Sequence, residues 1–147
     1  MMMMSTQTDN AMTIRIDEIA PSPGELIGLY ATASWGDRAA YDRDAMARVI
    51  ERSRFITARL TGEESGRVVG FARMLTDETL TTWIAEIIVD PAYQRCGIGR
   101  SLMEKVIERF GGTAIYAEAV AGVEQFFASC GLSRRPGMTV FSRKPAR

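Results

Sequence analysis

Apolar residues recur along this chain with two spacings, and these spacings divide the chain into strands and helices. Alternating positions and short apolar runs predict strands, which we place at residues 13–17, 55–60, 68–75, 83–89, 114–119 and 138–142. Apolar residues three and four positions apart predict helices, which we place at residues 23–33, 42–53, 98–110 and 123–129. This order predicts a mixed α/β fold whose middle strands form an antiparallel meander.

The segment between the strand at 83–89 and the helix at 98–110 carries the strongest chemical signal. It reads Gln94-Arg95-Cys96-Gly97-Ile98-Gly99-Arg100 and leads directly into Ser101. The start of a helix presents unpaired backbone N–H groups and the positive end of the helix dipole, so it attracts phosphate groups. Gly97 and Gly99 have no Cβ, which lets an anion approach the backbone, while Arg95 and Arg100 add positive charge. The segment therefore predicts a pyrophosphate-binding loop.

Two common phosphate-binding motifs do not fit this loop. A P-loop requires Lys-Ser or Lys-Thr after its glycines, and neither pair follows Gly99. The dinucleotide-binding fingerprint requires a third glycine where this chain has Leu102. What remains is Q-x-x-G-x-G, preceded by the sequence Ile-Ile-Val-Asp-Pro-Ala-Tyr. This pattern closely resembles the acetyl-CoA-binding motif of the GNAT superfamily of N-acetyltransferases, and the resemblance extends over roughly residues 12–143.

The resemblance implies a GNAT-type acyl-CoA N-acyltransferase fold. Such a fold has a mostly antiparallel central sheet, flanked by helices, whose fourth and fifth strands splay apart around the pantetheine arm. Acetyl-CoA is then the co-substrate, and a backbone N–H near Ile88 or Val89 is expected to point at the thioester oxygen. The expected acetyl-CoA contacts are Ile87, Ile88, Val89, Gln94, Arg95, Cys96, Gly97, Ile98, Gly99, Arg100, Ser101 and Phe127.

Acetyl transfer to a primary amine needs a group that removes a proton, because an amine with a pKa of about 10.4 is almost fully protonated at neutral pH. Glu86 and Glu118 are the candidates, since each interrupts an apolar strand beside the expected site. Both positions resemble places where family members carry acidic residues. A carboxylate in a cleft has a tunable pKa, but each glutamate could also face solvent on a half-exposed strand. The sequence leaves open which of the two is the base.

The chain departs from the family at the residue that usually donates a proton to the coenzyme A thiolate. Many members have F-Y-x-x-x-G-F, whereas this chain has Phe126-Phe127-Ala128-Ser129-Cys130-Gly131-Leu132. Phe127 therefore stands in the place of the tyrosine, and water or Tyr116 is left to protonate a thiolate with a pKa of about 8.5. Phe127 can pack against the cofactor arm or serve as an ordinary core residue. Its presence favours one alternative function, a non-catalytic acyl-CoA-binding regulatory module.

The acceptor site is expected at the first two helices and the loop between them. Tyr30, Trp35 and Asp37 lie there, with Tyr41 close by in the sequence. Aromatic rings and a carboxylate suit a small cationic amine, although the packing of a turn between helices would explain the rings equally well. No feature marks an extended peptide groove. We therefore expect the acceptor to be a small primary amine.

Composition and charge exclude several other classes of function. The 18 basic residues balance the 18 acidic ones, so the overall charge does not favour nucleic acid as a partner. The chain has no histidine, and we expect no metal site. No apolar run approaches the length of a membrane span, and residues 1–10 lack the features of a secretory signal. Two cysteines cannot form a disulfide framework, which predicts a reducing cytoplasm.

The expected organisation is one domain. We expect residues 1–11 to form a disordered tail and residues 12–147 to form a single GNAT-like acetyltransferase domain. Late strands in this fold often pair between subunits. A homodimer is therefore a further expectation from the resemblance.

Overall fold

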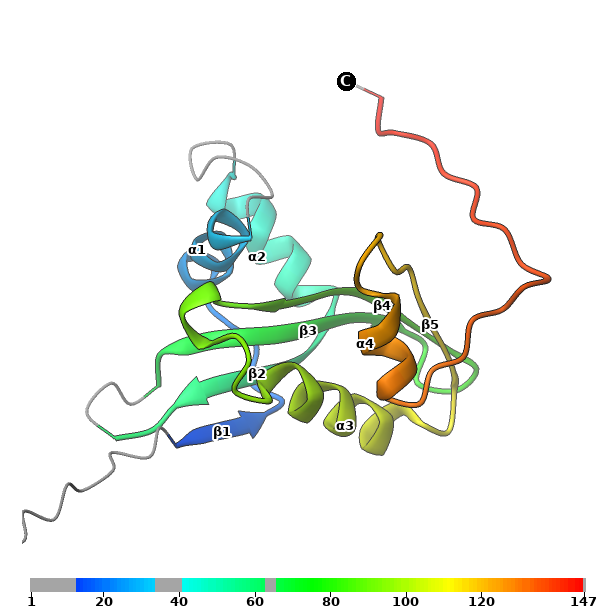
Figure 1. Cartoon of the computed structure of the whole chain (residues 1–147). Helices are drawn as coiled ribbons and strands as arrows, with labels where there is room; N and C mark the ends of the chain where they lie inside the picture. The colour runs from blue at the N-terminus through cyan, green and yellow to red at the C-terminus, as the bar shows by residue number, and fades with distance from the viewer. Residues whose placement is uncertain (1–12, 34–40, 63–65, 147) are drawn as a thin grey trace, which may run out of the picture.

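A computed structural model describes residues 13–33, 41–62 and 66–146 of the chain (Figure 1). These residues form one five-stranded sheet whose spatial order equals the order along the chain. Its strands are β1 (Ile14–Asp17), β2 (Arg54–Leu60), β3 (Val68–Thr76), β4 (Thr81–Val89) and β5 (Ala114–Ala117). β1 to β4 are antiparallel, and β5 is parallel to β4. The predicted mixed α/β fold with a mostly antiparallel sheet is confirmed.

Helices cover both faces of this sheet. α1 (Pro23–Thr32) and α2 (Arg43–Glu51) lie above it in Figure 1, and α3 (Ile98–Phe110) lies below it. α4 (Glu124–Ser129) belongs to the α3 side, because Phe126 and Phe127 pack against the same apolar cluster as α3. A short 3-10 turn, η2 (Pro91–Tyr93), connects β4 to the loop before α3. The sheet thus separates two hydrophobic cores, one under α1 and α2 and one under α3 and α4.

Local sequence signals explain where several elements begin and turn. Ser22 and Glu25 form a capping box at the start of α1, and the Asp42 side chain caps α2. Asp77 accepts hydrogen bonds from the backbone N–H groups of Thr79, Leu80 and Thr81, which fixes the turn between β3 and β4. These hydrogen bonds also lower the pKa of the Asp77 carboxyl group.

A β-bulge in β4 changes which face of the sheet its side chains meet. Met74 pairs with Ile84 and Arg73 pairs with Glu86, so Ala85 is the extra residue. Ile84 therefore packs in the core under α3, while Glu86 and Ile88 face α1. Simple alternation would place residues 84, 86 and 88 on the same face. The bulge is the reason why the sequence pattern could not settle where Glu86 points.

The strand predicted at residues 138–142 is wrong. The chain after α4 forms no strand within the described residues, and it extends away from the sheet in Figure 1. Met138, Val140 and Phe141 are exposed, the last at 92% of its surface. The alternating pattern there satisfies the side-chain rule for a strand, but a strand also needs backbone partners. β5 has only four residues, and the chain makes no such pairing with it in this structure.

Candidate active site

The start of α3 has the geometry of an anion-binding site. Gly97 lies at the N-cap with a φ of 80°, and its helix has no side-chain cap, unlike α1 and α2. The helical hydrogen bonds begin with the N–H of Ser101, which donates to the carbonyl oxygen of Gly97 at 3.0 Å. The N–H groups of the three residues between them have no acceptor within the helix. Those groups and the helix dipole point at the exposed loop formed by residues 94–97.

The two glycines of this loop have different structural roles. A Cβ on Gly97 would meet no atom within 4 Å, so the positive φ is what requires glycine there. A Cβ on Gly99 would lie 3.3 Å from the ring of Phe126, so Gly99 provides room for α4. The sequence interpretation gave both glycines the same role toward an anion. The Phe126 contact could not be read from the sequence, because it joins residues that are distant along the chain.

Side chains around the loop hold its backbone in place. The Gln94 amide donates to the carbonyl oxygen of Val89 at 3.1 Å, and Arg100 donates to the carbonyl oxygen of Ser129 at 3.3 Å. Ile98 is buried in the α3 core, so its backbone is the part of the residue that can reach a ligand. Gly70 is a further residue that the sequence analysis missed. A Cβ there would lie 3.0 Å from the Ile88 carbonyl oxygen and 3.5 Å from Ile98, so this glycine permits close packing behind the loop.

β4 and β5 splay apart next to this loop. Their pairing covers Thr81 to Ile84 on β4 and ends with Ile84 opposite Ala117. β4 continues to Val89, but it is then paired with β3 alone. The expected splay between the fourth and fifth strands is therefore present. Within the described residues, no strand lies beside the β5-facing edge of residues 85–89, which includes Ile87, Ile88 and Val89, so this edge can receive an extended ligand.

Glu86 lies at this splay inside a network of charged and polar groups. Nε and Nη2 of Arg73 donate to its two carboxylate oxygens at 2.5 and 2.8 Å, and the Tyr30 hydroxyl donates to Oε1 at 3.0 Å. Arg73 also donates to the Ser53 hydroxyl at 3.1 Å. The Glu86 side chain is only 11% exposed. This network joins α1, the residue before β2, and strands β3 and β4 at one point.

The same network shifts the pKa values of its members. Burial of the Tyr30 ring and then the negative charge of Glu86 raise the pKa of its hydroxyl far above the ordinary value. The hydrogen bonds to Glu86 raise the pKa of the Arg73 guanidinium. Tyr30 therefore stays neutral and Arg73 stays charged throughout the physiological range.

Glu118 has a more open environment than Glu86. It directly follows β5, is exposed, and lines a groove of about 1140 Å3 that runs along β5. Tyr116, Trp83 and Phe127 line the same groove. The rings of Trp83 and Tyr116 stack with centroids 6.1 Å apart and a tilt of 22°. The structure thus brings Glu118, Tyr116 and Phe127 to one groove and places Glu86 in the network with Arg73.

The predicted acceptor residues divide into described and undescribed ones. Tyr30 is 5% exposed, stacks on Tyr41 at 5.4 Å and meets Phe71 edge-on at 5.9 Å. Its hydroxyl donates to Glu86, so Tyr30 belongs to the network around that carboxylate. Trp35 and Asp37 lie outside the described residues. Their assignment to the acceptor site remains a prediction.

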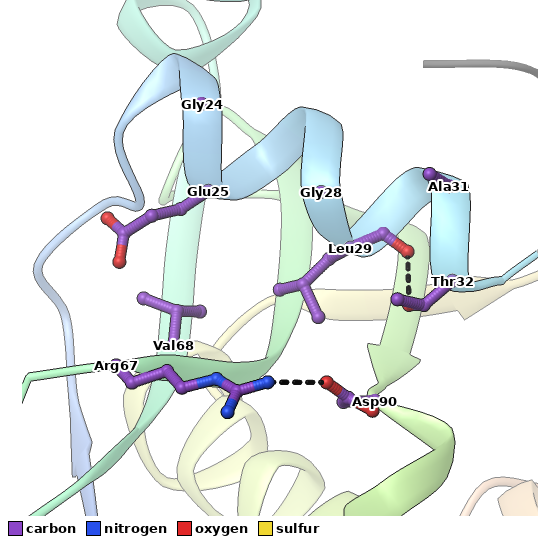
Figure 2. A pocket seen from close by; sticks show the side chains of 9 residues that line it. All are labelled: Gly24, Glu25, Gly28, Leu29, Ala31, Thr32, Arg67, Val68 and Asp90. Carbon is purple, nitrogen blue, oxygen red and sulfur yellow. Dashed lines mark hydrogen bonds and ion pairs between the residues drawn. The ribbon is translucent and has the colours of Figure 1, made fainter. Parts of the chain in front are cut away.

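A second cavity, of about 570 Å3, lies between α1 and the ends of two strands (Figure 2). Arg67 and Asp90 form an ion pair of 3.5 Å across its floor, and Glu25 borders it from the helix. Asp90 also accepts a hydrogen bond from the N–H of Ala92, which shapes the turn before the glycine loop. The residues predicted to hold acetyl-CoA do not line this cavity in the described part of the chain.

Possible metal ligands and possible membrane-spanning helices also bear on the type of site. The described residues contain no cluster of three or more ligating side chains that could hold a metal ion. Among the helices of the described residues, none has both the length and the apolar character needed to cross a membrane.

Comparisons with known proteins identify the family. The model of the acetyltransferase (GNAT) family matches residues 20–132. Histone acetyltransferase TAP1 from Glycine max is 26% identical over 137 residues, which covers 82% of this chain and 58% of the relative. The chain therefore spans little more than half the length of that relative.

Solved structures resemble the chain over most of its length. The GNAT family acetyltransferase SP0256 from Streptococcus pneumoniae TIGR4 superposes with a TM-score of 0.65 at 25% identity, covering 90% of this chain and 99% of that one. Glucosamine-6-phosphate N-acetyltransferase from Arabidopsis thaliana gives a TM-score of 0.70 at 14% identity, covering 90% and 98%. The second likeness shows the fold alone. With the matched family model and the open strand edge beside an uncapped helix, this chain belongs to the GNAT acetyltransferase family.

Proposed function

We propose that this protein transfers the acetyl group of acetyl-CoA to the primary amine of a small molecule by direct attack. The observation that carries the proposal is the continuity of two binding features. The open edge of β4 over residues 85–89 leads through η2 and the glycine loop into the uncapped start of α3. One offers peptide groups to an extended amide chain, and the other offers N–H groups to a diphosphate. Acetyl-CoA has both parts in that order.

The residues around these features fit acetyl-CoA in size and charge. The N–H groups of Ile98, Gly99 and Arg100 suit the pyrophosphate. The side chains of Arg95 and Arg100 add positive charge beside it. Ile87, Ile88 and Val89 offer their peptide groups to the pantetheine arm. Cys96 and Gln94 are exposed at the rim of the loop, where they border the same ligand. Phe127 lines the neighbouring groove and supplies apolar surface.

The reaction needs two proton transfers besides the attack. The amine nitrogen forms a bond to the thioester carbon, the carbon–sulfur bond breaks, and coenzyme A leaves as a thiolate. Glu118 or Glu86 takes the proton from the amine, directly or through water. Water or Tyr116 supplies the proton for the thiolate, because Phe127 has none to give. Glu118 is exposed, whereas Glu86 is tied to Arg73, and this difference favours Glu118 as the base.

The proposal also covers the kind of acceptor, the oligomeric state and the cellular location of the protein. One similar protein is named for a histone and another for glucosamine 6-phosphate, so the family alone does not select an acceptor. A small amine fits into the groove of about 1140 Å3 that residues of β5 and α4 line. A homodimer fits the free edge of β5 and the exposed residues after Gly137. The two unpaired cysteines fit a cytoplasmic location.

Release of free thiol from acetyl-CoA across a panel of primary amines tests the proposal. We expect turnover with at least one small amine, and a loss of turnover in the Glu118→Gln variant. Calorimetry with coenzyme A runs in parallel to measure binding alone. Binding without turnover on any amine would support the alternative, a non-catalytic acyl-CoA-binding module, which the phenylalanine at position 127 favours. Absence of binding would overturn both.

A further inference from the structure

The α1-facing side of the sheet has a covered part and an uncovered part. Phe71 on β3 and Ile88 on β4 are buried under α1. Further along the same face, Leu75 on β3 is 47% exposed and pairs with Trp83 on β4, whose indole is half-buried. Trp83 in turn pairs with Tyr116 on β5. One residue with an apolar or aromatic side chain from each of three neighbouring strands therefore stands on this face, and none of the three belongs to the hydrophobic cluster under α1 and α2.

Registers and core membership fix the orientation of these side chains. Met74, Ile84 and Ala117 pack toward α3, so their strand neighbours point to the opposite face. The stacking of Trp83 on Tyr116 confirms that the two rings share that face. Both rings also line the groove along β5. We call these two rings the aromatic stack.

Charged groups lie next to the aromatic stack, and the groove that it lines carries the carboxylates of Glu118 and Glu124 as well as the guanidinium groups of Arg134 and Arg135. Glu118 follows β5 two residues after Tyr116 and lines the same groove. Glu86 lies three residues after Trp83, on the same face because of the bulge, with Arg73 neutralising its charge. The pairing of β4 with β5 ends between these positions. An apolar wall, a free carboxylate and the open strand edge thus meet at one place.

We propose that the aromatic stack binds the aromatic or apolar body of the acceptor and that the acceptor is an arylalkylamine-type primary amine. This inference rests on the proposed function and names the substrate class for that site. An aryl ring packs well on exposed aromatic surface, and an ammonium group is attracted both by a carboxylate and by the faces of such rings. An amine whose body lies on Trp83 can direct its nitrogen toward Glu118 and the edge of β4. A short polar amine can make only the contact of its nitrogen with Glu118 and the edge of β4.

The end of the groove beside the aromatic stack suits this ligand. Apolar residues line much of the groove, among them Ile107, Val120 and Leu132, so a second copy of the chain is the occupant that the test must separate from an amine. Glu118 beside the stack matches a small ligand with one cationic end and one apolar end. Leu75 extends the apolar surface at the end away from Glu118, which sets the expected direction of the ligand.

The test uses matched amines and variants of the full chain. We expect kcat/KM for 2-phenylethylamine to exceed that for ethylamine at least about tenfold in the unchanged protein. Trp83→Ala should raise KM for 2-phenylethylamine about tenfold, leave kcat within twofold, and leave KM for ethylamine unchanged. Trp83→Leu keeps an apolar side chain, so its KM for 2-phenylethylamine should lie between the values of the unchanged protein and of Trp83→Ala. Ile19→Ala, a truncation of an exposed apolar residue next to the opposite edge strand, is the control and should change neither constant.

The outcomes separate this inference from the function on which it rests. Equal kcat/KM for the two amines, or no effect of either Trp83 variant on KM, would overturn the inference while acetyl transfer stands. Acetyl-CoA binding without turnover on any amine would overturn the proposed function and the inference with it. Light scattering tests whether a second copy of the chain occupies the aromatic stack instead. If Trp83→Ala changes the oligomeric mass but leaves KM unchanged, the stack is a contact between copies and the inference is wrong.

Discussion

The two halves of β4 have the same kind of sequence but different surroundings. From Thr81 to Ile84 the strand is paired on both sides, and the hydroxyl of Thr82 bonds those of Thr76 and Thr113 at 2.8 and 2.7 Å. From residue 85 to residue 89 it is paired on one side only. Residues 81–84, the closed half, therefore have a paired strand on each side. Residues 85–89, the open half, keep a free edge, which is where binding and chemistry become possible.

The junction between the halves shows how such a free edge stays in place. A bulge at Ala85 turns Glu86 toward α1, and Arg73 and Tyr30 hold its carboxylate from two other elements. The open half is therefore anchored on its covered face while its β5-facing edge remains free. The difference between the halves leads to predictions about stability for one half and about ligand binding for the other.

Breaking the anchor should have the largest effect. Arg73→Met leaves the Glu86 carboxylate poorly solvated and without its cation, and we expect a loss of about 3 kcal/mol in the free energy of unfolding. The double variant Arg73→Met/Glu86→Gln removes the charge and keeps an acceptor for Tyr30, so it should recover most of that loss. Urea denaturation measures both. A single variant within about 0.5 kcal/mol of the unchanged protein would show that the pair does not anchor the junction.

Closing the anion site should affect binding with little effect on folding. Gly97→Asp places a carboxylate at the N-terminus of α3 and a Cβ at a φ of 80°, so we expect coenzyme A affinity to fall at least about 100-fold. Gly66→Asp is the matched control, because Gly66 has a φ of 89° and equally open space but lies in the turn before β3. Isothermal calorimetry compares the two. Equal affinities in both variants would refute the anion site.

Much of the fold could be predicted from the sequence, because alternation and helical spacing are local. The strands over 55–60, 68–75 and 83–89 and the helix over 98–110 lie within one or two residues of their predicted bounds. The orientation of Glu86 could not be predicted, since it depends on a bulge that only strand pairing defines. The partnership of Glu86 with Arg73 spans 13 positions, and that of Gly99 with Phe126 spans 27, so no local pattern contains either. The strand predicted at 138–142 failed for the same reason, because its pattern says nothing about an available edge.

The closed half should respond to substitution in stability alone. Thr82→Val keeps the shape of a fully buried side chain but removes the hydroxyl between Thr76 and Thr113. We expect a loss of 1–2 kcal/mol, about the cost of leaving such hydroxyls without their partner. Coenzyme A affinity should stay within twofold. A large loss of affinity would mean that the two halves do not act separately.

The Tyr30 hydroxyl gives the junction a dependence on alkaline pH. Its pKa is raised in the folded protein, so the folded state binds more protons than the unfolded state once the pH exceeds about 10. The contribution is fully present below that pH and is lost as the pH rises further. We expect the unchanged protein to lose about 1 kcal/mol more than Tyr30→Phe between pH 10 and pH 11. Urea titrations at the two pH values measure the difference, and parallel losses in both proteins would contradict it.

Cys96 reports on the open half without any substitution in the binding loop. The thiol is exposed, lies one residue before Gly97, and contacts only the Gln94 carbonyl oxygen, at 3.6 Å, among the described residues. A diphosphate held by the start of α3 would cover this position, so acetyl-CoA should slow alkylation of Cys96 about fivefold by occlusion and by repulsion of the thiolate. Cys130, which is half-buried at the end of α4, is the internal control, and its labelling rate should not change. Mass spectrometry of iodoacetamide-treated protein resolves both sites in one sample.

The same labelling tests whether the junction positions the loop. Because the open half of β4, anchored through Arg73, fixes where the loop begins, Arg73→Met should weaken the protection of Cys96 by acetyl-CoA. Thr82→Val should leave that protection intact. Equal protection in both variants would separate the loop from the junction and restrict the comparison to stability.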